Sequence, residues 1–179
     1  MNSVAVGVLA VLSLLVIPQL LVCQFHNPTF DDLLLFLNTS IRIYIFTLNV
    51  GDKACPYYVK NFLNRTFYEF NYTSGECPLT METYIADLGN DTMAGYPYMD
   101  IHNWFGQPIL RKLMRYSNGN EKCALFSYIL NKRTHIEVHV RADKFAVRDE
   151  KKAFSTCYAV YKTYISQSNE LTRECTYKC

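Results

Sequence analysis

Between residues 41 and 141, polar and apolar residues alternate in short runs, and this period of two constrains the fold more than any other feature. Turn-forming residues such as those at 49–52, 89–91 and 118–120 separate the runs. No helical stretch that could carry a parallel crossover lies between them. The pattern predicts a meandering antiparallel barrel or sandwich, with eight strands at about 41–48, 55–62, 65–72, 79–87, 95–103, 109–117, 122–130 and 134–141.

Helical patterns flank this all-β region on both sides. Pro28 suits a first turn, Thr29 and Asp32 resemble a capping box, and a short helix would place Phe30, Leu33, Leu34 and Leu37 on one face. A second helix is predicted near 150–165, behind Asp149 and Glu150, because apolar residues recur there every three or four positions: Phe154, Cys157, Tyr161, Tyr164 and Ile165. This C-terminal helix would lie against the outside of a barrel.

The first 23 residues have the character of a secretory signal peptide. Val4 to Val22 is almost entirely apolar, and Pro18 would break the helix shortly before a cleavage point after Cys23. An uncleaved membrane anchor is the alternative, but no basic cluster follows to orient it. We therefore expect a signal peptide at 1–23, a single domain at 24–179 and an extracellular, secreted protein.

The cysteines agree with removal of this segment. The chain has seven, and cleavage after Cys23 leaves six that can all pair. No spacing typical of a zinc site occurs among them. We expect a disulfide framework, and no metal, from Cys55, Cys77, Cys123, Cys157, Cys175 and Cys179.

Four N-glycosylation sequons lie in the mature chain, at Asn38, Asn64, Asn71 and Asn90. Glycans are expected on Asn71, on an outward strand face, and on Asn90, in a turn. The net charge of +2 is small and the basic residues are scattered, so nucleic acid is not an expected partner. The aromatic content of 15%, with 14 Tyr and 11 Phe, suits strands around a half-polar cavity.

Strand alternation indicates which side chains face inward. An outward Asn71 places Tyr68, Phe70 and Tyr72 inside. These rings are interpreted either as a cavity wall or as ordinary core packing. The predicted inward aromatic set also includes Tyr44, Phe46, Trp104 and Phe126.

One strand combines histidine and glutamate on a single face. A period of two places His135, Glu137 and His139 together. If this face points to solvent, the three residues are only the polar side of an amphipathic strand. If it points to a barrel interior, Glu137 needs a cationic or hydrogen-bond-donating partner, which a ligand amine could supply. The run lacks the helix and spacing of a metalloprotease motif, and a third metal ligand is not in view. Other catalytic motifs are absent, so we predict no enzyme and no cofactor.

The order of these segments resembles the tick salivary lipocalins, the group with histamine-binding and leukotriene- or complement-binding members. The resemblance spans nearly all of the mature chain. It depends on Asp31–Phe36, the strand with Tyr44, Cys55-Pro-Tyr-Tyr, Asn64–Tyr72 with Ser74-Gly75, Tyr116–Cys123, Ile136–Val140, a helix with Cys157 and the final Cys179.

The resemblance implies an eight-stranded barrel with one closed end and a ligand cavity. It also implies disulfides Cys55–Cys179 and Cys123–Cys157, which leaves Cys77 and Cys175 to pair. The family's inward glutamate is retained as Glu137, but its inward tryptophan is replaced by His139. The strand after Cys123 carries no carboxylate, so the chain departs from a two-site histamine trap.

The expected function is sequestration of a small host mediator by a monomeric protein that has no membrane partner after signal cleavage. A biogenic amine such as histamine or serotonin would pair with Glu137, and binding would weaken below about pH 6.5 as His139 gains a proton. The alternatives are a fatty-acid mediator such as a leukotriene, inhibition of a host complement or clotting protein through the loops, or an unrecognised hydrolase.

Overall fold

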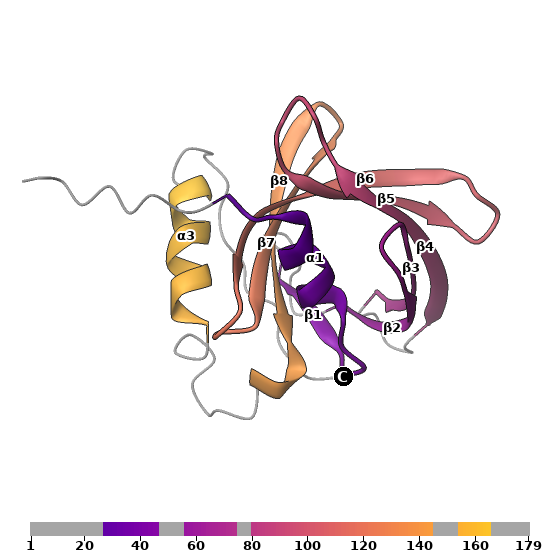
Figure 1. Ribbon diagram of the computed structural model, residues 1–179, viewed down its shortest axis with the longest axis horizontal. Coiled ribbons are helices and arrows are strands. Elements are labelled where there is room, and N and C mark those ends of the chain that lie inside the picture. The colour runs from indigo at the N-terminus through magenta and orange to yellow at the C-terminus, as the bar shows by residue number, and fades with distance from the viewer. Residues whose placement is uncertain (1–26, 47–55, 75–79, 145–153, 166–179) are drawn as a thin grey trace, which may run out of the picture.

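The computed structural model describes residues 27–46, 56–74, 80–144 and 154–165, and their strands form a closed antiparallel barrel (Figure 1). Each strand pairs with the next one in sequence, and the last pairs back onto the first. The predicted strands and barrel are therefore confirmed. Their bounds are β1 (Ile43–Phe46), β2 (Tyr57–Leu63), β3 (Phe67–Thr73), β4 (Met81–Asn90), β5 (Pro97–Asn103), β6 (Pro108–Asn118), β7 (Cys123–Leu130) and β8 (Arg133–Arg141), followed by a 3₁₀ turn at Ala142–Lys144.

Helix α1 (Phe30–Leu37) closes one end of the barrel. It begins with the predicted capping box: the Asp32 backbone N–H donates to the Thr29 hydroxyl, and the Thr29 backbone N–H donates to the Asp32 carboxylate. Leu33, Phe36 and Leu37 are buried in the barrel core. Since sequential hairpins alternate between the two ends, the β5–β6 and β7–β8 turns lie at the opposite, open end.

Helix α3 (Ser155–Ile165) packs outside the barrel against β6, β7 and β8, as predicted (Figure 1). The Cys123–Cys157 disulfide joins it to β7, which confirms the pairing implied by the resemblance. The Glu121 carboxylate also accepts hydrogen bonds from the backbone N–H groups of Thr156 and Cys157. Among the described residues, no helix has the length and apolar character needed to cross a bilayer.

Several predictions fall outside the described residues. They are the signal peptide, the helix start at Asp149 and Glu150, and the four cysteines Cys55, Cys77, Cys175 and Cys179.

The inner and outer faces of the strands belong to two separate apolar layers, one inside the barrel and one beneath α3. In β8, Val138 and Val140 pack outward with α3, whereas Glu137 and His139 face the barrel interior. The predicted inward phase of β8 and of Tyr68, Phe70 and Tyr72 in β3 is thus observed.

The inward placement predicted for Tyr44, Phe46 and Trp104 is wrong. In β1 it is Ile43 and Ile45 that enter the core, so Phe46 packs outward on Phe154 with ring centroids 5.3 Å apart. Tyr44 lies on that same outer face, with its ring 5.6 Å from the ring of Tyr57 in β2. Trp104 lies in the β5–β6 turn and is 62% exposed. A period of two leaves the phase of a short strand undetermined, and here the pairing of Ile45 with His139 sets it.

Candidate ligand-binding cavity

The barrel interior contains a cavity of about 300 Å³, within the range of small-molecule sites. Its wall is mainly aromatic and aliphatic, and exposed Ile109 at its rim marks the opening at the end opposite α1. The lining residues are Ile45, Tyr58, Tyr68, Phe70, Tyr72, Tyr84, Met99, Ile101, Ile109, Leu110, Lys112, Tyr128, Glu137 and His139.

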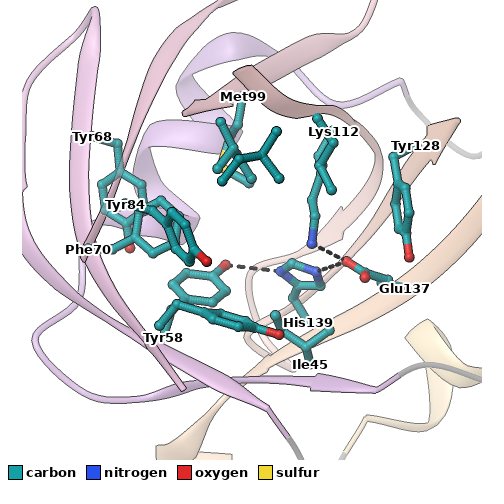
Figure 2. Close-up of a pocket in the computed structure, with 14 residues that line it drawn as sticks. Ile45, Tyr58, Tyr68, Phe70, Tyr84, Met99, Lys112, Tyr128, Glu137 and His139 are labelled. Atoms are coloured by element: carbon teal, nitrogen blue, oxygen red, sulfur yellow. Dashed lines mark hydrogen bonds and ion pairs between the residues drawn. The ribbon is translucent and has the colours of Figure 1, made fainter. Parts of the chain in front are cut away.

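A buried ion pair lies in this otherwise apolar wall. The ammonium of Lys112, on β6, donates to Oε2 of Glu137, on β8, and both residues are buried (Figure 2). The two strands are separated by β7, and inward-facing side chains bring the charges together across it. The cationic partner expected for Glu137 is therefore supplied by the protein itself.

His139 extends this pair into a four-residue network (Figure 2). Its Nε2 lies 2.9 Å from Glu137 Oε2, and its Nδ1 lies 3.0 Å from the hydroxyl of Tyr58. Burial raises the pKa of the Tyr58 hydroxyl well above its usual value, so this hydroxyl remains a donor. His139 therefore accepts from Tyr58 at Nδ1 and donates from Nε2 to the carboxylate, as a neutral imidazole.

The charge states of the network follow from burial and from its internal contacts. Burial alone raises the pKa of Glu137, but the nearby Lys112 ammonium and the hydrogen bond from His139 outweigh it and lower that pKa to about 2. Burial lowers the pKa of His139 to about 4, although its bond to Glu137 opposes this. The titration expected near pH 6.5 thus moves to about pH 4, and at neutral pH the charges of Lys112 and Glu137 cancel.

Tyr68 contributes a polar atom of a different kind. Its side chain is fully buried on the cavity wall, and its hydroxyl has no hydrogen-bond partner among the described residues. A buried hydroxyl without a partner costs about 1–3 kcal/mol. An entering ligand could satisfy this group.

The cavity brings together five of the predicted site residues, Tyr68, Phe70, Tyr72, Glu137 and His139. Phe126 also faces inward, but it packs between His139, with ring centroids 4.5 Å apart, and Phe36 of α1. His135 stacks on Tyr128 with ring centroids 5.1 Å apart.

Sequence reasoning missed Lys112 and Tyr58. The period of two could have predicted that Lys112 faces inward, since it lies between Leu110 and Met114, two apolar residues on the inner face of β6. For Tyr58, two adjacent tyrosines left the phase of β2 open.

One group of possible metal-binding side chains occurs in the described part of the chain, Glu121 with Cys123 and Cys157. The two cysteines form the disulfide, so neither offers a thiolate.

The similarities found for this chain are to solved structures. No family model matches the chain, and no curated protein matches its sequence. The siderocalin Ex-FABP, described as functioning through dual ligand specificities, is 12% identical with a TM-score of 0.46, covering 74% of this chain and 87% of its own. Lobster apocrustacyanin A1 is also 12% identical, with a TM-score of 0.39, covering 75% of this chain and 79% of its own.

Both neighbours are lipocalin-family proteins. The eight-stranded barrel assigned to this chain is established by its own continuous strand pairing, independently of these two similarities.

Proposed function

We propose that the protein binds a small, mainly apolar molecule in the barrel, with a hydrogen-bond-accepting oxygen at the ligand's inner end. The observation that carries this proposal is the Lys112–Glu137 pair. It neutralises the buried carboxylate, so the reason for expecting an amine at Glu137 is removed. A fatty acid or oxygenated fatty acid, the alternative raised by the sequence, has the required chemistry.

The polar atoms on the wall support a ligand that accepts hydrogen bonds. Among the described residues, the Lys112 ammonium donates to Glu137 alone, and an ammonium has three N–H groups. The Tyr68 hydroxyl has a further O–H to donate. A ligand carboxylate or carbonyl near these groups would gain charge-assisted bonds, each worth about 1.5–3 kcal/mol. The aromatic walls would contribute about 25 cal/mol per Å² of buried apolar area.

An incoming amine meets a less favourable site. It would approach a carboxylate that already accepts from Lys112 and His139, and it would lie beside the Lys112 positive charge. Either charged ligand adds a buried charge to the neutral pair, but an amine also requires partial displacement of Lys112, whereas a carboxylate can accept from the remaining N–H groups of Lys112.

The wider role that we propose is secretion and sequestration of a lipid mediator. Its supports are the apolar N-terminal segment, the sequons and the resemblance to the tick salivary lipocalins. N-terminal sequencing of the protein secreted from insect cells tests the cleavage after Cys23; a secreted chain that still begins at Met1 would contradict it.

Titration calorimetry with a fatty acid, a leukotriene, histamine and serotonin tests the ligand class. We expect the acids to bind and the amines not to bind. The double variant Lys112→Met/Glu137→Gln should bind the acids at least about tenfold more weakly, since it loses a charge-assisted bond without leaving an unpaired charge. Lys162→Met, on the outer helix α3, is the matched control and should bind normally. Amine binding in the absence of acid binding would overturn the proposal.

A further inference from the structure

We infer that the open end of the barrel docks onto an anionic phospholipid surface through the tips of two hairpins, the β5–β6 turn and the β7–β8 turn. These tips lie at the end of the barrel opposite α1, beside the cavity rim at Ile109. The sequence indicated no membrane partner for the mature chain, and the inference goes beyond the ligand binding proposed above. The docking itself does not depend on the identity of the ligand.

The β5–β6 turn presents two large aromatic side chains to solvent. Trp104 is 62% exposed and Phe105 is 86% exposed. Their backbone is held by Asn103, whose side-chain oxygen accepts from the N–H groups of Phe105 and Gln107, and by Gly106 at φ +77°. Because the backbone N–H groups of Phe105, Gly106 and Gln107 all donate to Asn103, the turn holds the exposed aromatic pair in place.

The β7–β8 turn adds apolar and cationic side chains at the same end. Ile129 and Leu130 are exposed, at 72% and 46%. Asn131 and Lys132 both have positive φ angles, 51° and 63°, in a two-residue turn that pairs Leu130 with Arg133. The turn imposes on Lys132 a left-handed backbone conformation that lysine rarely adopts. It thereby places the Lys132 side chain beside Arg133 at the tip.

The charges at this end favour an anionic surface. Lys132 and Arg133 are exposed and form no ion pair within the described residues. The acidic group at the described part of the open end is Glu82, which accepts from the Tyr84 hydroxyl. Cations beside exposed Trp, Phe, Ile and Leu are the combination that binds at the interface of anionic bilayers.

The shape of the tips favours a bilayer over a protein partner. Trp104 and Phe105 are exposed on a hairpin turn and Leu130 at the end of β7, so they can enter a lipid interface without a matching cavity, and Ile129 beside them borders a hollow on the outer face. Docking would also place the cavity rim against the membrane. An apolar ligand could then pass from lipid to barrel without crossing water; this consequence, unlike the docking, rests on the proposed function.

Trp104 is the chain's single tryptophan, so its fluorescence reports on this tip alone. With phosphatidylcholine vesicles that contain phosphatidylserine, we expect its emission to shift to shorter wavelength and to be quenched by lipids brominated on their acyl chains. Co-sedimentation should show stronger binding than to phosphatidylcholine alone, and added salt should weaken it.

Variants separate the apolar from the electrostatic contribution. Phe105→Ser with Ile129→Ser should weaken partitioning by about tenfold or more. Lys132→Gln and Arg133→Gln should each weaken binding to anionic vesicles by about fivefold, with little effect on neutral ones. Met93→Ser, at a 98% exposed position in the β4–β5 turn at the other end, is the matched control and should bind as the parent does.

Unchanged Trp104 emission with anionic vesicles would overturn the inference, as would equal losses in Met93→Ser and in the tip variants. Capture of a protein partner through the tips without vesicle binding would also overturn it. Because vesicle binding is measured without ligand, its failure is distinct from a failure of fatty-acid binding in solution.

Discussion

The ammonium of Lys112 and the carboxylate of Glu137 form an ion pair inside the barrel, where they come from strands that do not pair with each other. Removing one partner leaves an unpaired buried charge, which costs about 3–5 kcal/mol, whereas removing both can be nearly neutral. We therefore expect Lys112→Met to be much less stable in urea unfolding than Lys112→Met/Glu137→Met. Equal stability of the two variants would show that the pair is solvated.

The pH dependence of stability should reflect the lowered pKa values of both His139 and Glu137. The folded-state pKa values of His139, about 4, and Glu137, about 2, lie below their ordinary values of 6.5 and 4.5, so the unfolded chain binds protons more readily. Their stabilising contributions are present above pH 6.5 and 4.5 and are lost as pH falls through 4 and 2. Each shift corresponds to about 3 kcal/mol. Urea unfolding of His139→Gln should lack the loss between pH 6.5 and 4; a loss as steep as the parent's would contradict the assignment.

Two buried tyrosine hydroxyls on the cavity wall should respond differently to deletion. Tyr58→Phe removes the donor to His139 Nδ1 and should cost about 1–3 kcal/mol. Tyr68→Phe removes a hydroxyl without a partner, so stability should be unchanged or higher, while fatty-acid affinity should fall. Thermal unfolding and calorimetry on the two variants check this, and a large loss of stability in Tyr68→Phe would contradict it.

The disulfide that joins α3 to the barrel should contribute substantially to stability. We expect the double variant Cys123→Ala/Cys157→Ala to lose about 2–5 kcal/mol in urea unfolding. Glu121→Gln is a useful companion, because it keeps hydrogen-bonding capacity but removes the charge that accepts from the start of α3. A double cysteine variant as stable as the parent would show that packing alone holds the helix.

Glycans are expected on Asn71 and Asn90 of the secreted protein. The Asn71 amide donates to Asn61 on the outer face of the sheet, and a glycosylated amide retains one N–H for that bond. Asn90 is exposed at the end of β4. Peptide mass mapping before and after N-glycosidase treatment should find both sites modified, and Asn71→Gln and Asn90→Gln should each reduce the mass; an unmodified chain would show that the sequons are silent.

The sequence determined the meandering antiparallel strands, because each strand has its own alternation and each turn its own turn-forming residues, but it left barrel and sandwich both open. It also determined α1 through the local contacts of Thr29 and Asp32, and it grouped Tyr68, Phe70 and Tyr72 on one face of β3 and Glu137 and His139 on one face of β8. These properties depend on residues within a few positions of one another.

Only the tertiary structure decided the chemistry of the cavity. The contact of Lys112 with Glu137 depends on closure of the barrel, which no local pattern encodes. The same holds for β1, where four residues fit either face until Ile45 pairs with His139. In β6 a bulge between Met114 and Tyr116 turns Tyr116 out to the layer beneath α3, because an extra residue reverses the alternation that the sequence alone would continue.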